Sequence, residues 1–297
     1  MAKPRTILKR VRTIGNIRTV TKAMQAVASV RFKAAHDRIV SFAPFATELV
    51  GVVGDVIARS DPEAPAHPLL RAAEGVRHEV LLLLTSTRGL CGAYNANVLD
   101  LGIQRLGQLR GAGYEVELHV VGRRGVQYLE FRGFEINREH EPLSDISRYD
   151  LVAALADSMM SDFLAGRISG LEVAYTQFVS SGQQRPAIVP ILPIEDLPGP
   201  REPADPDLQT ALPFDFLPSP EQILQKLLPV AVRIKLYQCF LDAAAAEQFI
   251  RRASMQAATD NANDMIHDLR LRANRQRQRQ ITMELAEIMS GRSGLGE

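Results

Sequence analysis

The sequence predicts an α/β protein in which two long terminal helices form an antiparallel coiled coil and a compact α/β domain lies between them in the chain. Both ends are poor in glycine and proline and carry apolar residues at helical spacing, whereas the middle alternates strand-like with helix-like runs. We therefore expect three parts, a helix in residues 1–58, an α/β domain in residues 59–215 and a second helix in residues 216–297.

The first long helix is predicted from about residue 3 to residue 58. Apolar or small residues recur there at 3-4 spacing, and Ile7 and Val11 extend the pattern with a shift of phase. The positions of this seam are Ile14, Ile17, Thr21, Met24 and Ala28. A helix of about 55 residues would reach roughly 80 Å, which exceeds the width of an ordinary domain. Such a helix needs a partner helix along its seam.

The middle of the chain has the alternating order of a small, mostly parallel sheet that ends in an antiparallel hairpin. It follows a link rich in helix breakers, from Asp61-Pro62 to Pro68, and Ser181-Gly182 is the hairpin signal. Residues Pro198–Pro213 are expected to be an irregular loop. We expect strands at Val80–Thr85, Glu115–Val121, Leu171–Val179 and Ala187–Ile194, and helices at Ala96–Leu109, Gly125–Phe131 and Asp150–Leu164.

The last helix has a clear start signal, with Ser219 at the N-cap, Pro220 at the first helical position and Gln222 two residues later. Pro229 is the one candidate break, and no glycine follows before Gly291. About 70 helical residues would reach roughly 105 Å. The other terminal helix is the nearest partner for its apolar seam, which predicts the antiparallel coiled coil.

Composition and charge bound the class of protein. The chain has 297 residues, of which 46% are apolar and 23% charged, and its net charge is +1, which is typical of a soluble globular protein. Residues 1–36 nevertheless contain nine lysines and arginines and no acidic residue, which suggests an acidic partner surface.

The cysteines and apolar runs exclude further classes. Cys91 and Cys239 are far apart, which argues against a disulfide framework or a zinc site and fits a reducing compartment. The first ten residues contain no secretory signal, and the apolar run around Leu81–Leu84 is far shorter than the ~20 residues that span a bilayer. We expect no direct membrane span.

Signatures of catalysis are absent from the sequence. No lysine stands in a P-loop, and neither HExxH nor GxSxG occurs. Gly89 and Gly92 follow a predicted strand but lack the third glycine of a dinucleotide site, so a tight strand-to-helix turn is the better interpretation. His119 is expected in the core and the other five histidines at the surface. We expect no catalytic, cofactor-binding or metal-binding residues.

Three segments resemble the gamma subunit family of F-type ATP synthases. They match the family in order, at both ends and in the middle of the chain, and the C-terminal segment is the most specific. These segments are Thr21-Lys22-Ala23-Met24-Gln25-Ala26-Val27-Ala28 with Asp37-Arg38; Thr85-Ser86-Thr87-Arg88-Gly89-Leu90-Cys91-Gly92-Ala93-Tyr94-Asn95; and Ala257-Ala258-Thr259-Asp260-Asn261-Ala262 with Asn274, Arg277-Gln278 and Ile281-Thr282-Met283-Glu284-Leu285-Ala286-Glu287-Ile288.

The resemblance implies the function of a rotor shaft without catalytic residues. In this family the coiled coil stands inside a hexamer of alpha and beta subunits, and a Rossmann-like α/β domain is its foot on the ring of c subunits, beside epsilon. Ion flow turns the ring, and the asymmetric shaft drives each beta subunit through its open and closed states. The resemblance and the start of the chain together imply a peripheral protein on the cytoplasmic side of a bacterial inner membrane, and no nucleic-acid partner.

The resemblance also implies roles for particular residues. Met24 and Arg251 match positions tied to coupling between catalysis and transport, and Met24 is also expected in the coiled-coil seam. A second set matches positions that hydrogen-bond with a beta loop, namely Arg277, Gln278, Thr282 and Glu284. The signature turn is marked by Arg88, Gly89, Cys91 and Gly92.

Some residues depart from the family pattern. Thr87 stands where aspartate is usual, Ala246 replaces a serine, and Phe249 stands where a small residue is usual. These departures imply altered packing between the helices or altered partners. They leave open an alternative, the gamma subunit of a divergent F-type ATPase that pumps sodium or protons.

Two rival classes are weighed against this interpretation. A nucleic-acid-binding coiled coil would explain the basic helices, and a Rossmann-type enzyme would explain the α/β domain. Neither accounts for the C-terminal signature. Salt-sensitive binding of random DNA would favour the first rival, and a shift of melting temperature with nucleotides would favour the second.

Overall fold

A computed structural model describes residues 4–58, 67–71, 75–140, 148–180, 182–194 and 219–293. The predicted link from Asp61 to Pro68 lies mostly outside these residues, and Ser181 and the predicted loop Pro198–Pro213 lie wholly outside them. In chain order the elements are α1 (Pro4–Ala58), a 3₁₀ turn (Pro68–Leu70), β1 (His78–Leu84), α2 (Tyr94–Gly111), β2 (Glu115–Val121), α3 (Arg123–Phe131), β3 (Arg138–His140), α4 (Tyr149–Leu164), β4 (Gly170–Ser180), β5 (Gln183–Leu192) and α5 (Pro220–Ser293).

The five strands form one sheet in the order β3-β2-β1-β4-β5. The first four strands are parallel, and β5 returns antiparallel to β4, so the predicted mixed sheet is confirmed. Strand β3 was not predicted. Its three residues are charged or polar and have no apolar alternation, and pairing with β2 alone makes them a strand.

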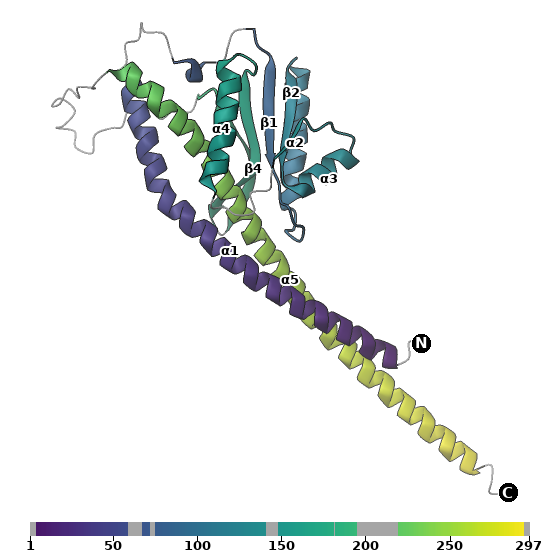
Figure 1. The fold of residues 1–297 in the computed structure, drawn as a ribbon. Coiled ribbons are helices and arrows are strands. Elements are labelled where there is room, and N and C mark those ends of the chain that lie inside the picture. Colours follow the sequence, from purple (N-terminus) through teal and green to yellow (C-terminus); the bar gives the residue numbers. More distant parts are fainter. Residues whose placement is uncertain are drawn as a thin grey trace. The chain divides into compact units, whose positions relative to one another are not determined.

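The chain divides into two compact units, which are described separately. The α/β unit comprises residues 30–250, and the helical unit comprises residues 1–29 together with 251–297. Helices α1 and α5 each contribute to both units. In the α/β unit, α2 and α3 cover one face of the sheet and α4 covers the other (Figure 1).

The core of the α/β unit has two layers because the sheet is covered on both faces. Strand β1 is buried along most of its length, as expected for a parallel strand between two layers. Leu81 and Leu83 pack under α2 and α3, whereas Leu82 packs toward α4 and the adjoining parts of α1 and α5. The terminal helices thus contribute to the same core as the sheet.

Within the α/β unit, residues 30–58 of α1 run antiparallel to residues 220–250 of α5. Phe32 packs on Phe249 and Phe42 on Tyr237, with ring centroids 5.4 and 5.1 Å apart. Phe249, a departure from the family pattern, also packs against Phe178 of β4. This bulky residue therefore ties both terminal helices to the hairpin.

Helix α5 begins where the sequence predicts. The backbone N–H of Gln222 donates to the hydroxyl of Ser219 at 3.4 Å, which satisfies one free donor of the first turn. Pro229 lies inside the helix and does not end it. The predicted break candidate is therefore accommodated within α5.

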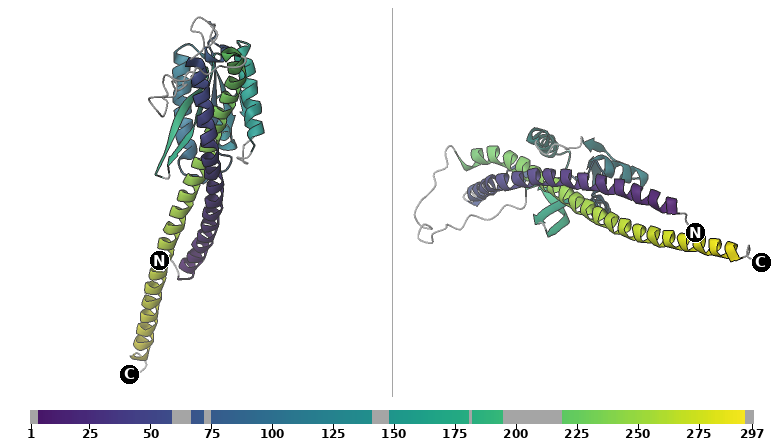
Figure 2. Two further views of the ribbon diagram at one scale, coloured as in Figure 1. Left: turned by 90° about the vertical axis from the view of Figure 1, so that its left-hand side faces the viewer. Right: turned by 90° about the horizontal axis from the view of Figure 1, so that it is seen from below.

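In the helical unit, the start of α1 lies alongside α5 in an antiparallel pair (Figure 2). The seam differs from the predicted one in phase. Ile17 is 51% exposed, and the seam position falls on Arg18, which contacts Asn263 of α5. Thr21 and Ala28 are buried, as predicted, and Met24 is only half-buried.

By length and composition, α1 is the one helix among the described residues that could cross a membrane, over Thr6–Ile57. Its apolar residues also have partners in the α/β unit. Ala46, Val53 and Val56 are buried, and the last two belong to the main core. Burial in a protein core accounts for only part of this apolar composition, since other apolar residues of α1, such as Val27, Val40 and Val52, are exposed.

The outer strand β5 carries two prolines, Pro186 and Pro190. A proline has no N–H to donate to a neighbouring strand, so prolines in sheets are found at edges. β5 is an edge of this sheet.

Candidate functional site

Three pairs of polar side chains join the two helices of the helical unit. Each pair has one residue from α1 and one from α5, and the α5 number falls as the α1 number rises, as expected for antiparallel helices. The pairs are Arg18–Asn263, with a 3.4 Å hydrogen bond, Thr21–Thr259, with hydroxyls 2.7 Å apart, and Gln25–Gln256, in which the Gln25 amide donates to the Gln256 carbonyl oxygen.

The threonine pair is the buried member of this set. The Thr21 hydroxyl also lies 3.0 Å from the Arg18 carbonyl, and the Thr259 hydroxyl 2.8 Å from the Met255 carbonyl. One hydroxyl therefore donates across the pair while the other donates to its own helix. A slip of the helices would break the bond between the two hydroxyls, at a cost of about 1 kcal/mol, although each could still donate to its own helix. The pair thus fixes the helix register, as single polar seam residues do in coiled coils.

We expect Thr21→Val and Thr259→Val each to destabilise the helical unit by about 1 kcal/mol, and the double variant to cost about 1 kcal/mol less than their sum. The reason is that each single variant removes the shared hydrogen bond. The measurement is amide hydrogen exchange of residues 255–262 in the full chain. Thr19→Val is the control, because Thr19 is exposed and bonds only to the Gly15 carbonyl. Additive effects would contradict a bond across the helices.

Apolar residues complete the seam on either side of the polar pairs. On α5, Met255, Ala262, Ile266 and Ala273 are buried at 3-4 spacing together with Thr259. Small residues at two of these positions allow the helices to approach closely. Beyond Gln276, every α5 side chain described, up to Ala286, is exposed.

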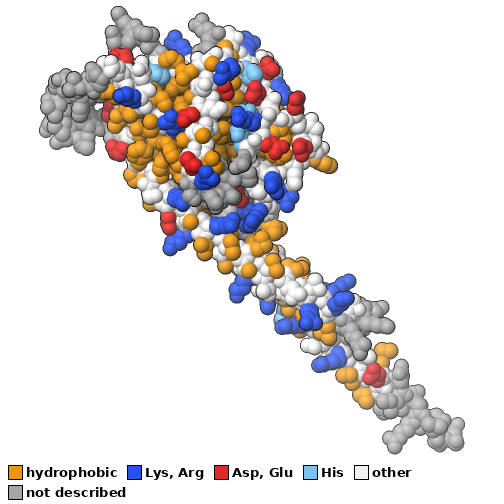
Figure 3. Space-filling model, viewed as in Figure 1, with side chains coloured by type: hydrophobic (Ala, Val, Ile, Leu, Met, Phe, Trp, Pro, Cys, Tyr) orange, Lys and Arg blue, Asp and Glu red, His pale blue; other side chains and the backbone are white. Residues whose placement is uncertain are grey.

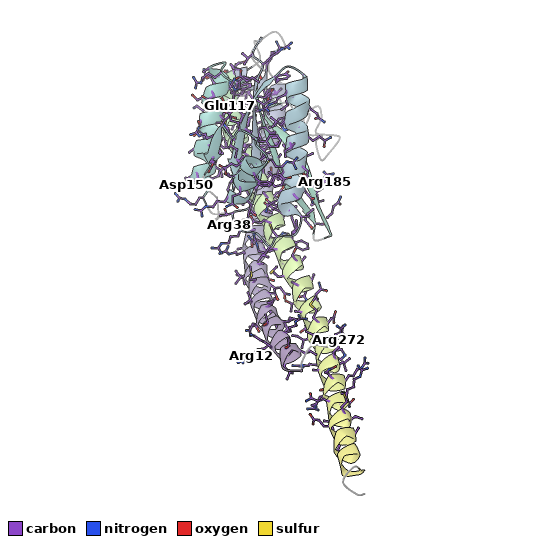
Figure 4. All side chains as sticks on the ribbon, turned by 90° about the vertical axis from the view of Figure 1, so that its right-hand side faces the viewer. Arg12, Arg38, Glu117, Asp150, Arg185 and Arg272 are labelled. Atoms are coloured by element: carbon purple, nitrogen blue, oxygen red, sulfur yellow. The ribbon has the colours of Figure 1, made fainter. Side chains whose placement is uncertain are left out.

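The surface of the helical unit is strongly basic. Its described side chains include twelve lysines and arginines and four acids. Figure 3 shows these basic side chains spread along the unit, and Figure 4 marks Arg12 on α1 and Arg272 on α5. Nine of the cations are exposed and form neither an ion pair nor a side-chain hydrogen bond with any part of the chain that the structure describes, namely Lys9, Arg10, Arg12, Lys22, Arg270, Arg272, Arg275, Arg277 and Arg279.

A groove of about 890 Å³ lies between the two helices at the level of the polar pairs. Arg18, Lys22 and Gln25 line it from α1, and Asp260 and Asn263 line it from α5. The groove is polar and open, so it suits contact with polar side chains of another chain better than an apolar ligand.

The two residues predicted to couple catalysis to transport lie in the paired part of the helical unit. Met24 is half-buried on α1, one residue before the Gln25 layer. Arg251 is 7% exposed, so it is held inside the protein, which is rare for an arginine.

The four predicted beta-contacting residues lie on the exposed end of α5. Their contacts are local to that helix. The Thr282 hydroxyl donates to the Gln278 carbonyl at 3.0 Å, and the Gln280 amide donates to Glu284 at 3.0 Å. Arg277 is exposed beside them. The side chains of Glu287 and Ile288, part of the sequence signature, lie outside the described residues. The structure does not bring these residues together with Met24.

The signature turn, between β1 and α2, is in the α/β unit. Leu90 and Gly92 have positive φ, 65° and 53°, which lets the chain reverse within a few residues. Cys91 is buried, and its sulfur lies 3.3 Å from the Asn95 amide, which also donates to the Ser86 hydroxyl. This network holds Arg88 and Gly89 in a rigid tight turn.

The histidines differ in part from the sequence expectation. His119 is 3% exposed, in agreement with a core position. Of the five expected at the surface, only His267 is exposed; His36 and His67 are half-buried, and so are His78 and His140, which lie beside His119. Within the described residues no three His, Cys, Asp or Glu side chains converge as metal ligands would.

Sequence reasoning did not predict the three polar pairs that join the two helices. It placed Thr21 in the seam and Thr259 in a signature, without pairing them. The signal was available as polar residues at seam spacing on both helices, at positions 18, 21 and 25 of the first and 256, 259 and 263 of the second. An apolar bias in choosing seam positions concealed it.

Comparisons with known proteins agree over the full chain. A family model described as ATP synthase matches residues 3–295. The ATP synthase gamma chain of Rhodopirellula baltica is 37% identical over 293 residues, which cover 98% of each chain. That of Mycolicibacterium gilvum is 35% identical over 303 residues, covering 97% of this chain and 96% of the relative.

Solved structures share the fold. A chain of the Euglena gracilis mitochondrial ATP synthase (OSCP/F1/c-ring) superposes with a TM-score of 0.65 at 13% identity, covering 98% of this chain and 94% of that one. A chain of the Tetrahymena thermophila mitochondrial ATP synthase central stalk/c-ring gives 0.55 at 19% identity, covering 80% and 99%. At these identities the likeness shows a shared fold.

Proposed function

The chain belongs to the ATP synthase gamma chain family and is the rotor shaft of an F-type complex, and we propose that it transmits torque through its paired terminal helices without catalytic residues of its own. In this proposal, residues 1–58 and 216–297 are the shaft, and residues 59–215 are the foot. The shaft acts by making different contacts with each state of the catalytic subunits, because only differential contact can shift their equilibrium.

The observation that carries this proposal is the set of nine exposed cations without an ion-pair partner in the described chain. Cations on two adjoining helices repel each other, and enclosing them in a neutral protein cavity would cost free energy. Acidic groups around the shaft would remove both costs. We infer that alpha and beta subunits surround the helical unit and that acidic loops of beta face it.

The proposed contacts follow from where the residues lie. Arg277, Gln278, Thr282 and Glu284 are exposed on the part of α5 beyond the helix pair, where a beta loop can reach them from outside. Met24 and Arg251 lie in the paired part, where they would transmit strain between the helices. The signature turn at Arg88, Gly89, Cys91 and Gly92 is rigid enough to serve as a bearing surface.

The α/β unit supports the part of the proposal that concerns the foot. A two-layered core joined to both terminal helices can pass torque without bending. We propose that the foot binds the c-subunit ring and epsilon, and that the complex lies on the cytoplasmic side of the bacterial inner membrane. The protein is peripheral there, and no membrane span, nucleic acid or cofactor is part of the proposal.

Co-purification tests this proposal. The chain is tagged in its native host, extracted in gentle detergent and analysed by mass spectrometry together with ATPase assays. Recovery of alpha, beta, epsilon and c subunits with ATPase activity is expected. Recovery of nucleic acid, or of the chain without the hexamer, would overturn it.

Replacing Met24 with lysine is expected to reduce ATP-driven ion pumping several-fold more than ATP hydrolysis. The added cation would strengthen a contact with an acidic beta loop that must break at every step of rotation. Pumping into inverted vesicles and hydrolysis are measured on the same preparation. Met24→Leu is the control because it keeps the size and the apolar character. Equal losses of pumping and hydrolysis would count against the proposed role.

A further inference from the structure

Four titratable side chains form a chain of contacts across three neighbouring strands of the α/β unit. Glu117 of β2 lies between two histidines, 3.1 Å from Nε2 of His78 on β1 and 3.2 Å from Nε2 of His119. Nδ1 of His119 lies 3.3 Å from Nε2 of His140 on the edge strand β3. Figure 4 marks Glu117 at this place.

These contacts determine where the protons lie. A carboxylate accepts hydrogen bonds, so the proton of His119 is on Nε2, which faces Glu117. Nδ1 of His119 then has a free lone pair, and His140 donates to it from Nε2. The hydrogen bond between the two histidines therefore requires that His119 is neutral, because a proton on its Nδ1 would remove the acceptor. A proton on His140 would keep the bond but would place a charge in a half-buried position beside Arg138.

The other charged groups around His119 and His140 act on the charge of His119 in opposite directions. Glu117 and Asp162 of α4 favour a positive charge on His119, whereas Arg138 of β3 opposes it. Asp162 is already paired with Arg167. Together with His78, these side chains line a cavity of about 480 Å³ under the edge of the sheet.

Strand β3 depends on this pair because little else holds it. It is three residues long and pairs only with β2. Besides that ladder, Asn137 accepts from the Leu118 N–H at 2.8 Å and its own N–H donates to the Leu118 carbonyl at 3.0 Å. Two protonated imidazoles in place of the His119–His140 bond would repel each other at this edge.

We propose that the His119–His140 pair is a pH-sensitive clasp, which holds β3 on the sheet at neutral pH and releases it in acid. Release opens the last strand of the sheet without unfolding its buried centre.

The direction of the pH dependence follows from burial. Burial, with smaller effects of His119 and Arg138, lowers the pKa of His140 from 6.5 to about 4, and burial also lowers the pKa of His119. An imidazole whose pKa is lowered in the closed state favours that state fully above pH 6.5, and this preference is lost as the pH falls from there toward about 4. For His140 alone, the opening equilibrium constant rises about eightfold between pH 7.0 and pH 5.5.

Hydrogen exchange in the full chain tests the clasp. Peptides that cover residues 134–140 are followed at pH 7.0 and pH 5.5, with the intrinsic pH dependence of exchange removed. We expect opening of β3 to rise about eightfold in the unmodified chain. His140→Gln keeps an N–H donor that cannot be protonated, so it is expected to lose the eightfold part of the response that His140 supplies.

Controls separate the clasp from a general effect of acid. His267→Gln, an exposed histidine in the helical unit, is expected to respond as the unmodified chain does. NMR titration of the unmodified chain is a second measurement that needs no variant to fold. An eightfold response that His140→Gln retains, no response in the unmodified chain, or an imidazole of His140 that titrates above about pH 6 would each overturn the clasp.

Discussion

Reversing four exposed charges of α5, in the variant R270E/R272E/R275E/R279E, is expected to weaken strongly the assembly of the subunit with the proposed alpha and beta hexamer while leaving its own fold intact. These arginines are exposed and have no ion-pair partner in the described chain, so each reversal should change the free energy of unfolding by less than about 0.5 kcal/mol. Against an acidic sleeve each turns an attraction into a repulsion, with a combined cost of about 3 kcal/mol or more. Affinity should fall by roughly a hundredfold.

The neutral variant R270Q/R272Q/R275Q/R279Q is the matched control. It should lose about half of the binding free energy that the reversed variant loses, and the remaining difference should shrink at high salt. Assembly is measured by reconstitution with alpha and beta subunits, and the fold by circular dichroism. Equal losses in the two variants would show that side-chain contacts rather than charge hold the shaft. Normal assembly of the reversed variant would contradict an acidic sleeve.

Gly122→Ala is expected to destabilise the α/β unit by about 3 kcal/mol or more, which corresponds to a melting temperature lower by roughly 10 °C. Gly122 joins β2 to α3 with a φ of 97°, a conformation that alanine rarely adopts. A Cβ there would lie 2.2 Å from the Thr85 carbonyl oxygen, which belongs to the backbone and cannot move alone. The Thr85 hydroxyl, in turn, donates to the Val121 carbonyl at 2.7 Å.

Gly107→Ala is the control for the glycine variant. Gly107 is exposed in the interior of α2, and a Cβ there would meet nothing within 4 Å. Alanine should therefore raise stability by up to about 1 kcal/mol, because it favours the helix. Thermal melting of the full chain measures both variants. A Gly122→Ala chain that melts with the unmodified one would mean that the β2–α3 turn can change its path.

The fold could be predicted because its strongest signals are local. Long periodic segments, the Ser219 cap and the apolar run of β1 each depend on neighbours in sequence. Strand β3 could not be predicted, because Arg138, Glu139 and His140 become a strand only through β2. Its contact with His119, twenty-one residues away, is likewise invisible in the sequence.

The phase of the helix seam shows why the candidate site was harder to predict. Residues 14, 17, 21, 24 and 28 and residues 14, 18, 21, 25 and 28 fit 3-4 spacing equally well. Apolar character favours the first set, because it places Ile17 and Met24 in the seam. The structure instead uses Arg18 and Gln25, because Asn263 and Gln256 of α5 supply polar partners. The partner helix therefore decides between two phases that one helix leaves equivalent.

The two prolines of β5 affect how free, unassembled subunits can aggregate. β5 is the last strand of its sheet, and an unprotected edge strand can recruit further copies into a growing ladder. Pro186 and Pro190 withhold an N–H at two of the ten positions of the strand, so a second copy cannot form a continuous ladder with it. The sequence thus protects the free subunit against aggregation at this edge during the interval before assembly.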